Sequence, residues 1–303
     1  MKFTVEYPVS AAGYDRALVG RKGMEQVVRA AEDCGYDAIA FTEHPAPSKK
    51  WLDAGGHESL DLTSALSFCA ALTGRIRLMT YLLVLPYRNP FVTAKALTTV
   101  DLLSDGRLTV VAGTGYLRSE FRSLGVEFAE RNELFDEALE VMRGAWTTVP
   151  YAYKGRHFEA GGVASVPRPA QAGGPPVWIG GNSSRARARA ARNQGWSPLM
   201  VSDEVARTTR SPGISTIEAL ASHITRVREA AAAEQGGDAP FDVQVQTPAS
   251  RHLLEGGSAE EHRDHLGRLA EAGVTSFVLQ TPGDSAGRAA DSLREYAETV
   301  GIR

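Results

Sequence analysis

Apolar residues occur along this chain in short runs that alternate with longer amphipathic segments. A short apolar run predicts a strand buried on both faces, whereas apolar residues repeated every three to four positions predict a helix. The runs that predict strands cover 3–7, 38–41, 76–85, 108–112, 177–179, 196–201, 241–246 and 275–279. The segments that predict helices cover 24–35, 62–72, 91–103, 130–146, 183–192, 217–233, 259–272 and 286–300.

Strands that alternate with helices predict a parallel sheet, and eight such repeats favour a closed (β/α)8 barrel (a TIM barrel) over an open sheet. The first strand-to-helix turn has no G-x-G-x-x-G pattern, so an open dinucleotide-binding sheet lacks its signature. Residues 147–174 interrupt the alternation with turn residues and Pro167-Arg168-Pro169. We interpret them as an insertion loop between the fourth helix and the fifth strand, within a single barrel domain of residues 1–303.

The composition excludes some classes of function. The net charge is −3, whereas a nucleic-acid surface needs a basic excess. No apolar run reaches the ~20 residues that span a bilayer, and the N-terminus is too polar for a signal peptide. Cys34 and Cys69 lie in Ala-rich helical stretches, where small buried thiols of a reducing compartment are expected. We therefore expect a cytoplasmic protein that acts on a small molecule.

Barrel enzymes carry their chemistry at the C-terminal ends of the strands, so candidate site residues are expected there. The second strand runs into Thr42-Glu43-His44-Pro45, and a histidine there can exchange a proton near neutral pH. The alternative is a histidine that only holds a loop at the rim. Thr80 interrupts the third strand, as a bulge beside a ligand would, although its hydroxyl could equally bind backbone. Gly113-Thr114-Gly115-Tyr116 follows the fourth strand, and its glycines would let backbone approach a flat ligand.

The fifth strand is followed by Gly180-Gly181-Asn182-Ser183-Ser184, a glycine turn and a polar helix start. Asn182 or Ser183 can cap this helix, and its first N–H groups favour a phosphate. The alternative is an ordinary capped turn. Arg185, Arg187, Arg189 and Arg192 are expected on a solvated helix face, with the first two close enough to the cap to meet an anion.

The seventh helix carries His262 and His265, three residues apart, with acidic residues nearby. A solvated face is expected here and not a metal site, because the helix belongs to the outer ring and lacks an H-E-x-x-H pattern. No Ser-His-Asp pattern or G-x-S-x-G elbow occurs elsewhere in the chain.

Together these stretches resemble the luciferase-like monooxygenase superfamily, and within it the oxidoreductases that use the deazaflavin coenzyme F420. The likeness is carried by 42–45, by Leu83-Val84-Leu85-Pro86-Tyr87-Arg88-Asn89-Pro90, by 102–108 and by Pro175-Pro176-Val177-Trp178-Ile179-Gly180-Gly181. The resemblance extends from residue 1 to about residue 200. The last third of the chain resembles the family only in its barrel pattern of strands and helices.

This resemblance implies a cofactor ring at the barrel mouth, with His44 near its reactive face, and a homodimer. It implies a bulge in the third strand, often with a non-proline cis peptide, which would fall at Tyr81-Leu82. The residues that would line the ring or take the phosphate are Thr80, Tyr81, Leu82, Thr114, Gly115, Gly180, Gly181, Asn182 and Ser183.

One position departs from the family pattern. Some F420-dependent enzymes place a Glu directly after the Gly-Thr-Gly of the fourth strand, and this chain has Tyr116 there. The candidate proton donors are therefore His44, Glu43 and Tyr116. Residues 46–58 also look individual and are expected to help select the substrate.

Three functions follow as hypotheses. The first is hydride transfer between coenzyme F420 and a small organic substrate, with His44 transferring a proton or polarising the substrate. The second is an FMN-dependent monooxygenase of the same superfamily, in which reduced flavin activates oxygen. The third is a non-catalytic flavin- or deazaflavin-binding protein.

Overall fold

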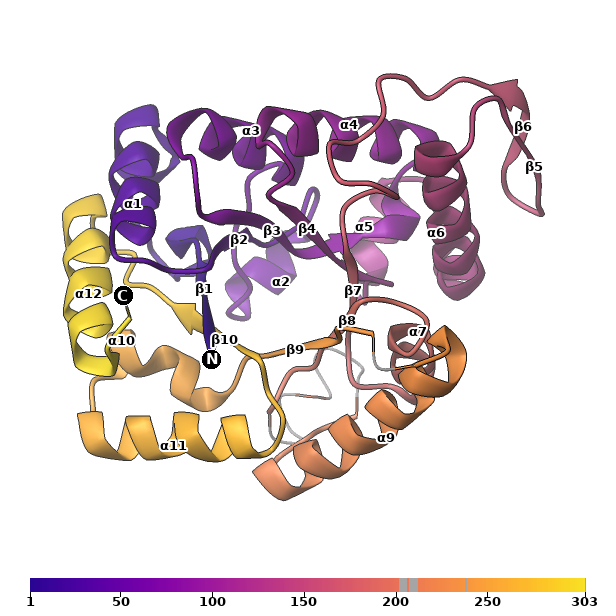
Figure 1. The fold of residues 1–303 in the computed structure, drawn as a ribbon. Coiled ribbons are helices and arrows are strands. Elements are labelled where there is room, and N and C mark those ends of the chain that lie inside the picture. The colour runs from indigo at the N-terminus through magenta and orange to yellow at the C-terminus, as the bar shows by residue number, and fades with distance from the viewer. Residues whose placement is uncertain (202–205, 207–211, 238, 303) are drawn as a thin grey trace. The chain divides into compact units, whose positions relative to one another are not determined.

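The computed structural model describes residues 1–201, 206, 212–237 and 239–302, and its central feature is a closed barrel of parallel strands (Figure 1). Around the barrel the strands follow the order β1-β10-β9-β8-β7-β4-β3-β2. Their bounds are β1 (Lys2–Glu6), β2 (Ala38–Phe41), β3 (Arg77–Val84), β4 (Leu108–Gly113), β7 (Val177–Gly180), β8 (Gly195–Ser197), β9 (Asp242–Val245) and β10 (Ser276–Gln280). The predicted (β/α)8 architecture is confirmed.

Each predicted helix corresponds to a helix of the structure. These are α1 (Arg21–Asp33), α3 (Leu62–Leu72), α4 (Pro90–Leu103), α6 (Arg131–Thr147), α7 (Ser184–Ala190), α9 (Ile217–Gln235), α11 (Ala259–Glu271) and α12 (Ala286–Val300). Three shorter helices were not predicted, namely α2 (Lys49–Asp53), α5 (Arg118–Ser123) and α10 (His252–Glu255). The 3-10 turns η1 (Pro8–Ser10), η2 (Arg16–Val19), η3 (Leu85–Tyr87), η4 (Phe128–Glu130) and η5 (Pro248–Arg251) were not predicted either.

Capping residues fix several of these boundaries. Asp61 accepts a hydrogen bond from the backbone N–H of Ser64, so α3 begins where the sequence predicted it. The sixth strand is shorter than predicted, because β8 ends at Ser197, directly before Pro198. Beyond it, only isolated bridges at Leu199 and Val201 continue the strand pattern.

The chain divides into two compact units, the first formed by Met1–Ala40, Arg75–Arg77 and Val177–Arg303. Within this unit α1 packs against α12, and the two helices lie side by side in Figure 1. The buried side chains of the pair include Val27 and Val28 of α1 and Leu293 of α12, each 0% exposed. Burial of such aliphatic side chains is the main source of stability for the outer layer of a barrel.

The second unit is formed by Phe41–Gly74 and Leu78–Pro176. In it α4 packs against α3 and α6. A small core cluster of Val84, Tyr87 and Phe121 joins the end of β3 to η3 and α5. This cluster supports the loops that carry the candidate active site described below.

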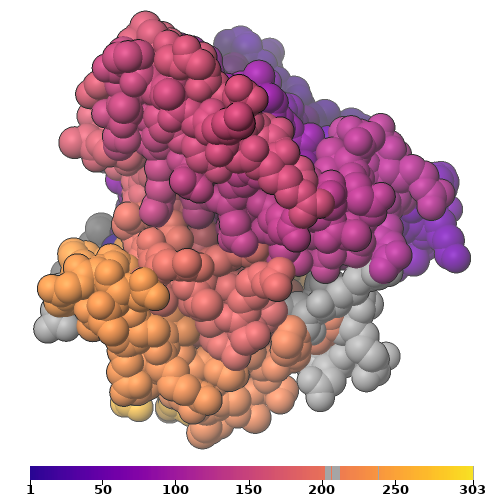
Figure 2. All heavy atoms as spheres, turned by 90° about the vertical axis from the view of Figure 1, so that its right-hand side faces the viewer, coloured from indigo at the N-terminus to yellow at the C-terminus, as the bar shows by residue number. Residues whose placement is uncertain are grey.

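The segment predicted as an insertion loop contains a hairpin of two antiparallel strands, β5 (Tyr151–Lys154) and β6 (Glu159–Val163). Its strands expose most of their residues and lie on the face that Figure 2 shows. Glu137 of α6 holds the hairpin turn, because its carboxylate accepts the backbone N–H groups of His157 and Phe158 at 2.9–3.0 Å.

Two side chains expected on solvated helix faces are buried instead. His262 is 4% exposed, since its ring stacks on His252 at 4.2 Å and its Nε2 lies 2.7 Å from the Tyr296 hydroxyl. Burial lowers the pKa of His262 to about 4. Arg189 is likewise 4% exposed, so the solvated-face prediction is wrong for both residues. No group of three or more metal-ligating side chains occurs among the described residues.

Cys34 and Cys69 are free thiols, as predicted, but Cys34 is partly exposed and not buried as expected. Cys69 is buried in α3, and burial raises the pKa of its thiol to about 12, so this thiol is unreactive. Within the described ranges no helix has the length and apolar character needed to cross a membrane.

Candidate active site

The centre of the candidate site is a pair formed by His44 and Glu120 in the second unit. His44 follows the end of β2, and its Nδ1 lies 3.1 Å from Oε2 of Glu120 in α5. The Glu120 side chain is fully buried, and that of His44 is 10% exposed. A histidine bonded through Nδ1 has its ring orientation fixed and presents Nε2 for other contacts.

Glu120 is itself held by two further donors. The Tyr87 hydroxyl donates to Oε2 at 2.9 Å, and the backbone N–H of Ala46 donates to Oε1 at 3.2 Å. Burial, reinforced by the neighbouring Glu120 carboxylate, raises the pKa of Tyr87, so Tyr87 remains a neutral donor. These hydrogen bonds fix the position of the Glu120 carboxylate beside Nδ1 of His44.

Aromatic rings surround His44. The ring of Trp51, in α2, lies 4.4 Å from that of His44, and the ring of His57 lies 4.9 Å away. Gly56 makes this packing possible, because a Cβ there would lie 2.3 Å from the Trp51 ring. Burial lowers the pKa of His57, which keeps this second imidazole neutral at pH 7. Trp51 and His57 were not predicted as site residues, although both fall in the segment expected to select the substrate.

Glu43 anchors the end of β3. One oxygen accepts the backbone N–H of Val84 at 2.6 Å, and the other accepts a charged hydrogen bond from Arg88. Burial raises the pKa of Glu43 to about 7, against the lowering effect of Arg88 and of the Val84 N–H. The catalytic role of Glu43 stays a prediction. In this structure both carboxylate oxygens accept hydrogen bonds from Val84 and Arg88.

The bulge and the cis peptide implied for the third strand are both present. The pairing of β3 with β4 shifts register between Tyr81 and Leu83, and the Tyr81-Leu82 peptide is cis. Thr80 is buried, and its hydroxyl donates to the Val111 carbonyl at 2.8 Å, so the backbone-bonded alternative for this hydroxyl is the one observed.

The Gly-Thr-Gly segment after β4 lies close to the core cluster. Gly115 has a φ of +73°, and a Cβ there would lie 2.7 Å from Val84 and 3.0 Å from Phe121. Tyr116 follows, with its ring 6.0 Å from that of His44. Burial, assisted by Glu120, raises the pKa of Tyr116 to about 12, so near neutral pH it can donate a proton but not accept one. Thr114 is half-buried in the same loop.

The predicted phosphate turn lies in the first unit. Ser183 caps α7 by accepting the Ala186 N–H at 3.1 Å, as predicted. The Asn182 amide binds the carbonyls of Leu199 and Pro212 and accepts the Leu199 N–H. Its side chain therefore ties loops together, and Gly180, Gly181, Asn182 and Ser183 remain predicted phosphate contacts.

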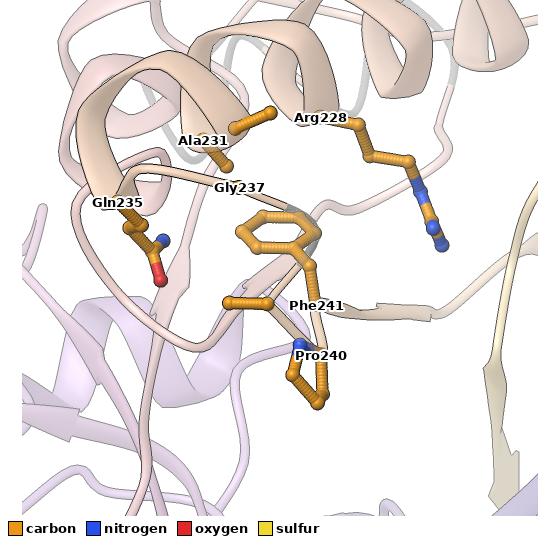
Figure 3. A pocket seen from close by; sticks show the side chains of 8 residues that line it. Arg228, Ala231, Gln235, Gly237, Pro240 and Phe241 are labelled. Carbon is orange, nitrogen blue, oxygen red and sulfur yellow. The ribbon is translucent and has the colours of Figure 1, made fainter.

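A crevice of about 310 Å³ in the first unit lies at the N-terminal end of β9, away from the strand ends that carry chemistry in barrels (Figure 3). Its polar side chains already bind backbone carbonyls: Arg228 donates to Gly273, and Gln235 donates to Ala191 and Asn193. We do not assign a site to it.

Comparison with known proteins places the chain among redox enzymes. It is 27% identical over 268 residues to an uncharacterized protein of Mycobacterium tuberculosis, covering 84% of this chain and 83% of that protein. An F420-dependent glucose-6-phosphate dehydrogenase of Amycolatopsis mediterranei is 33% identical over 51% of this chain and 48% of its own. An FMNH(2)-dependent dimethylsulfone monooxygenase of Pseudomonas fluorescens is 31% identical, and the match covers 46% of this chain and 38% of that protein.

The fold comparison agrees with the barrel. The crystal structure of monooxygenase RslO1 from Streptomyces bottropensis superposes with a TM-score of 0.81 at 20% identity, covering 99% of this chain and 98% of that one. The model of the luciferase-like monooxygenase family matches residues 1–252, beyond the limit near residue 200 that the sequence motifs suggested. The chain therefore belongs to the luciferase-like monooxygenase family of oxidoreductases.

Proposed function

We propose that this enzyme is a coenzyme F420-dependent oxidoreductase that transfers a hydride between the deazaflavin and a small organic carbonyl or alcohol. The observation that carries the proposal is the pairing of His44 with the buried Glu120 at the end of β2. The family restricts the chemistry to a flavin or a deazaflavin, since its relatives include F420- and FMN-dependent enzymes.

Hydride transfer to a carbonyl carbon leaves negative charge on the oxygen, and His44 is suited to stabilise that charge. An imidazolium at this position has the Glu120 carboxylate as its counter-charge, which is held by Tyr87 and Ala46. The surrounding Trp51 and His57 rings limit access of water, which strengthens such an interaction.

The residues beside His44 fit a polar, planar cofactor. Thr42 Oγ1 is buried and has no hydrogen-bond partner among the described residues, so it can bind a polar atom of a bound ring. Thr114 and Gly115 are the residues expected to line the ring. When bound, the reduced deazaflavin would supply the hydride, and the protein would orient the substrate and manage its proton.

A direct cofactor titration tests the proposal. We expect oxidised F420 to bind with a micromolar or lower Kd, followed by the change in its fluorescence, and more tightly than FMN. Tight binding of FMN without F420 binding would contradict the F420 assignment. The second candidate, an FMN-dependent monooxygenase, is favoured by the likeness to the dimethylsulfone monooxygenase and predicts oxygen uptake with reduced FMN.

Replacing His44 tests the assigned residue. His44→Ala should lower turnover by about 100-fold or more, the usual loss for a proton-transfer group, with little change in cofactor Kd. The matched control is His223→Ala, a partly buried histidine of α9 that should leave turnover near the wild-type value. If His44→Ala turned over like the wild type, the catalytic role of His44 would be wrong.

A further inference from the structure

A second imidazole, that of His57, lies beside His44 in the second unit and takes no part in the hydrogen bonds argued so far. The two ring centroids are 4.9 Å apart, and the ring planes meet at 77°. The Trp51 ring packs against both imidazoles, 4.4 Å from His44 and 5.6 Å from His57. His57 belongs to residues 46–58, the segment expected to help select the substrate, so its polar atoms bear directly on that selection.

The hydrogen bond of His57 fixes its tautomer. Its Nδ1 lies 3.0 Å from the backbone carbonyl oxygen of Glu58. A carbonyl oxygen only accepts, so Nδ1 carries the ring proton and donates it. Burial lowers the pKa of His57 and a charge on His44 lowers it further, so the ring is neutral above pH 7. In this neutral ring Nε2 has no proton and is a hydrogen-bond acceptor.

The Nε2 atom of His57 is available to a bound molecule. Within the part of the chain that the structure describes, no group donates a hydrogen bond to it. His57 is only partly buried, and its Nε2 is not one of the fully buried polar atoms that lack a partner. Nε2 of His44 is available in the same way, because the bond to Glu120 uses Nδ1. Two neighbouring imidazoles thus each offer one nitrogen to a ligand.

These two nitrogens have opposite hydrogen-bonding character. His44, with Glu120 as its counter-charge, donates from Nε2 as an imidazolium in the hydride transfer proposed above. His57 accepts at Nε2, and the cation on His44 disfavours a second cation on His57, so the two roles stay distinct. A carbonyl oxygen and a hydroxyl on adjacent carbon atoms match such a donor and acceptor on neighbouring rings.

We propose that His57 is a specificity-determining residue, which accepts a hydrogen bond from a hydroxyl on the carbon next to the reacting carbonyl. The proposal rests on the proposed hydride transfer and names its substrate class: α-hydroxy carbonyl compounds, and vicinal diols in the reverse direction. His44 binds the reacting oxygen, and His57 binds the neighbouring hydroxyl. An analogue without that hydroxyl proton leaves Nε2 of His57 without a donor, which lowers kcat/KM for the analogue.

Acetone, hydroxyacetone and methoxyacetone test this preference with reduced F420 as the cofactor. Methoxyacetone keeps the second oxygen and its electron withdrawal but has no proton to donate. We expect the wild type to favour hydroxyacetone over methoxyacetone in kcat/KM by at least about tenfold. His57→Phe, which keeps a ring against Trp51 but has no acceptor, should lower this ratio by about tenfold. His57→Gln, whose amide oxygen can accept, should retain part of the preference, and cofactor Kd should not change.

The matched control is His223→Phe, because His223 also packs edge-on against a tryptophan, with its ring 6.4 Å from that of Trp196. This variant should keep the wild-type ratio. An equal ratio in the wild type and in His57→Phe would overturn the role of His57. A merely structural role would lower kcat/KM for all three ketones alike and leave the ratio unchanged.

The tautomer gives a second readout that needs neither cofactor nor turnover. Above pH 7, nitrogen NMR of the cofactor-free protein should show His57 protonated at Nδ1 and unprotonated at Nε2. A proton on Nε2 would overturn the proposal, since the acceptor would then be absent. Failure of the wild type to bind F420 would refute the proposed function instead, and it would leave the tautomer of His57 as measured.

Discussion

At the scale of single residues, the surroundings of each carboxyl group determine its chemistry. Glu120 accepts a hydrogen bond from a histidine, Glu43 forms an ion pair with Arg88, and Glu6 has only neutral partners. The first can stabilise a cation, the second holds a strand end, and burial without a paired cation raises the pKa of the third. These three buried glutamates thus differ through their partners and not through their exposure.

Replacing Glu120 by Gln should expose its electrostatic role. The variant keeps the shape of the side chain, and its one amide oxygen can still accept from His44 and Tyr87, but it loses the negative charge and the acceptor for the Ala46 N–H. We expect turnover to fall by at least tenfold, since a charge-assisted hydrogen bond contributes roughly 1.5–3 kcal/mol. Steady-state kinetics should show this loss in kcat, with cofactor Kd changed by no more than a few fold. Glu127→Gln, on the nearby η4 turn, is the matched control.

The sequence predicted His44 but not the residues that act with it. His44 follows a buried strand, and the strand-end rule of barrels singles out such a position. Glu120 lies 76 residues later, and only the closure of β2, β3 and β4 around one end brings such partners together.

At the scale of elements, the pattern of apolar residues predicted the long helices and the barrel strands, because each buries one regular face. The bounds of α3 and α12 agree with their predicted ranges. The short helices α2 and α5 escaped prediction because tertiary contacts stabilise them, as in the packing of Trp51 on His44. The hairpin of β5 and β6 escaped because its strands are mostly exposed and lack a regular apolar alternation.

Glu137 should control the stability of that hairpin. Glu137→Ala removes the acceptor for the partly buried His157 and Phe158 N–H groups, and a donor left unpaired costs up to roughly 1–3 kcal/mol. We expect a lower thermal midpoint and faster limited proteolysis between residues 150 and 163. Glu137→Gln, which retains one acceptor oxygen, should show a smaller effect. Identical proteolysis of the wild type and both variants would show that Glu137 does not hold the hairpin.

At the scale of the whole molecule, buried titratable groups with opposite effects set the dependence of stability on pH. His262 is neutral in the fold with a pKa near 4, and burial also lowers the pKa of His252 and His265. These groups bind protons more readily when the chain unfolds, so they destabilise the fold as pH falls below about 6.5. Glu43, with a pKa near 7, acts in the opposite direction, because its neutral form is favoured in the fold.

The contribution of His262 can be isolated by comparing the wild type with His262→Gln, in which the amide can still bind the Tyr296 hydroxyl. A shift of the pKa from 6.5 to about 4 makes the wild type less stable at pH 5 than at pH 8 by about 2 kcal/mol from this residue alone. Titrating groups distant from His262 contribute equally to both proteins, so their effects cancel in the difference. Urea unfolding at the two pH values should therefore show a smaller loss of stability for His262→Gln. An equal loss in both proteins would show that His262 keeps an ordinary pKa in the fold and would contradict the effect assigned to the burial of its ring against His252 and Tyr296.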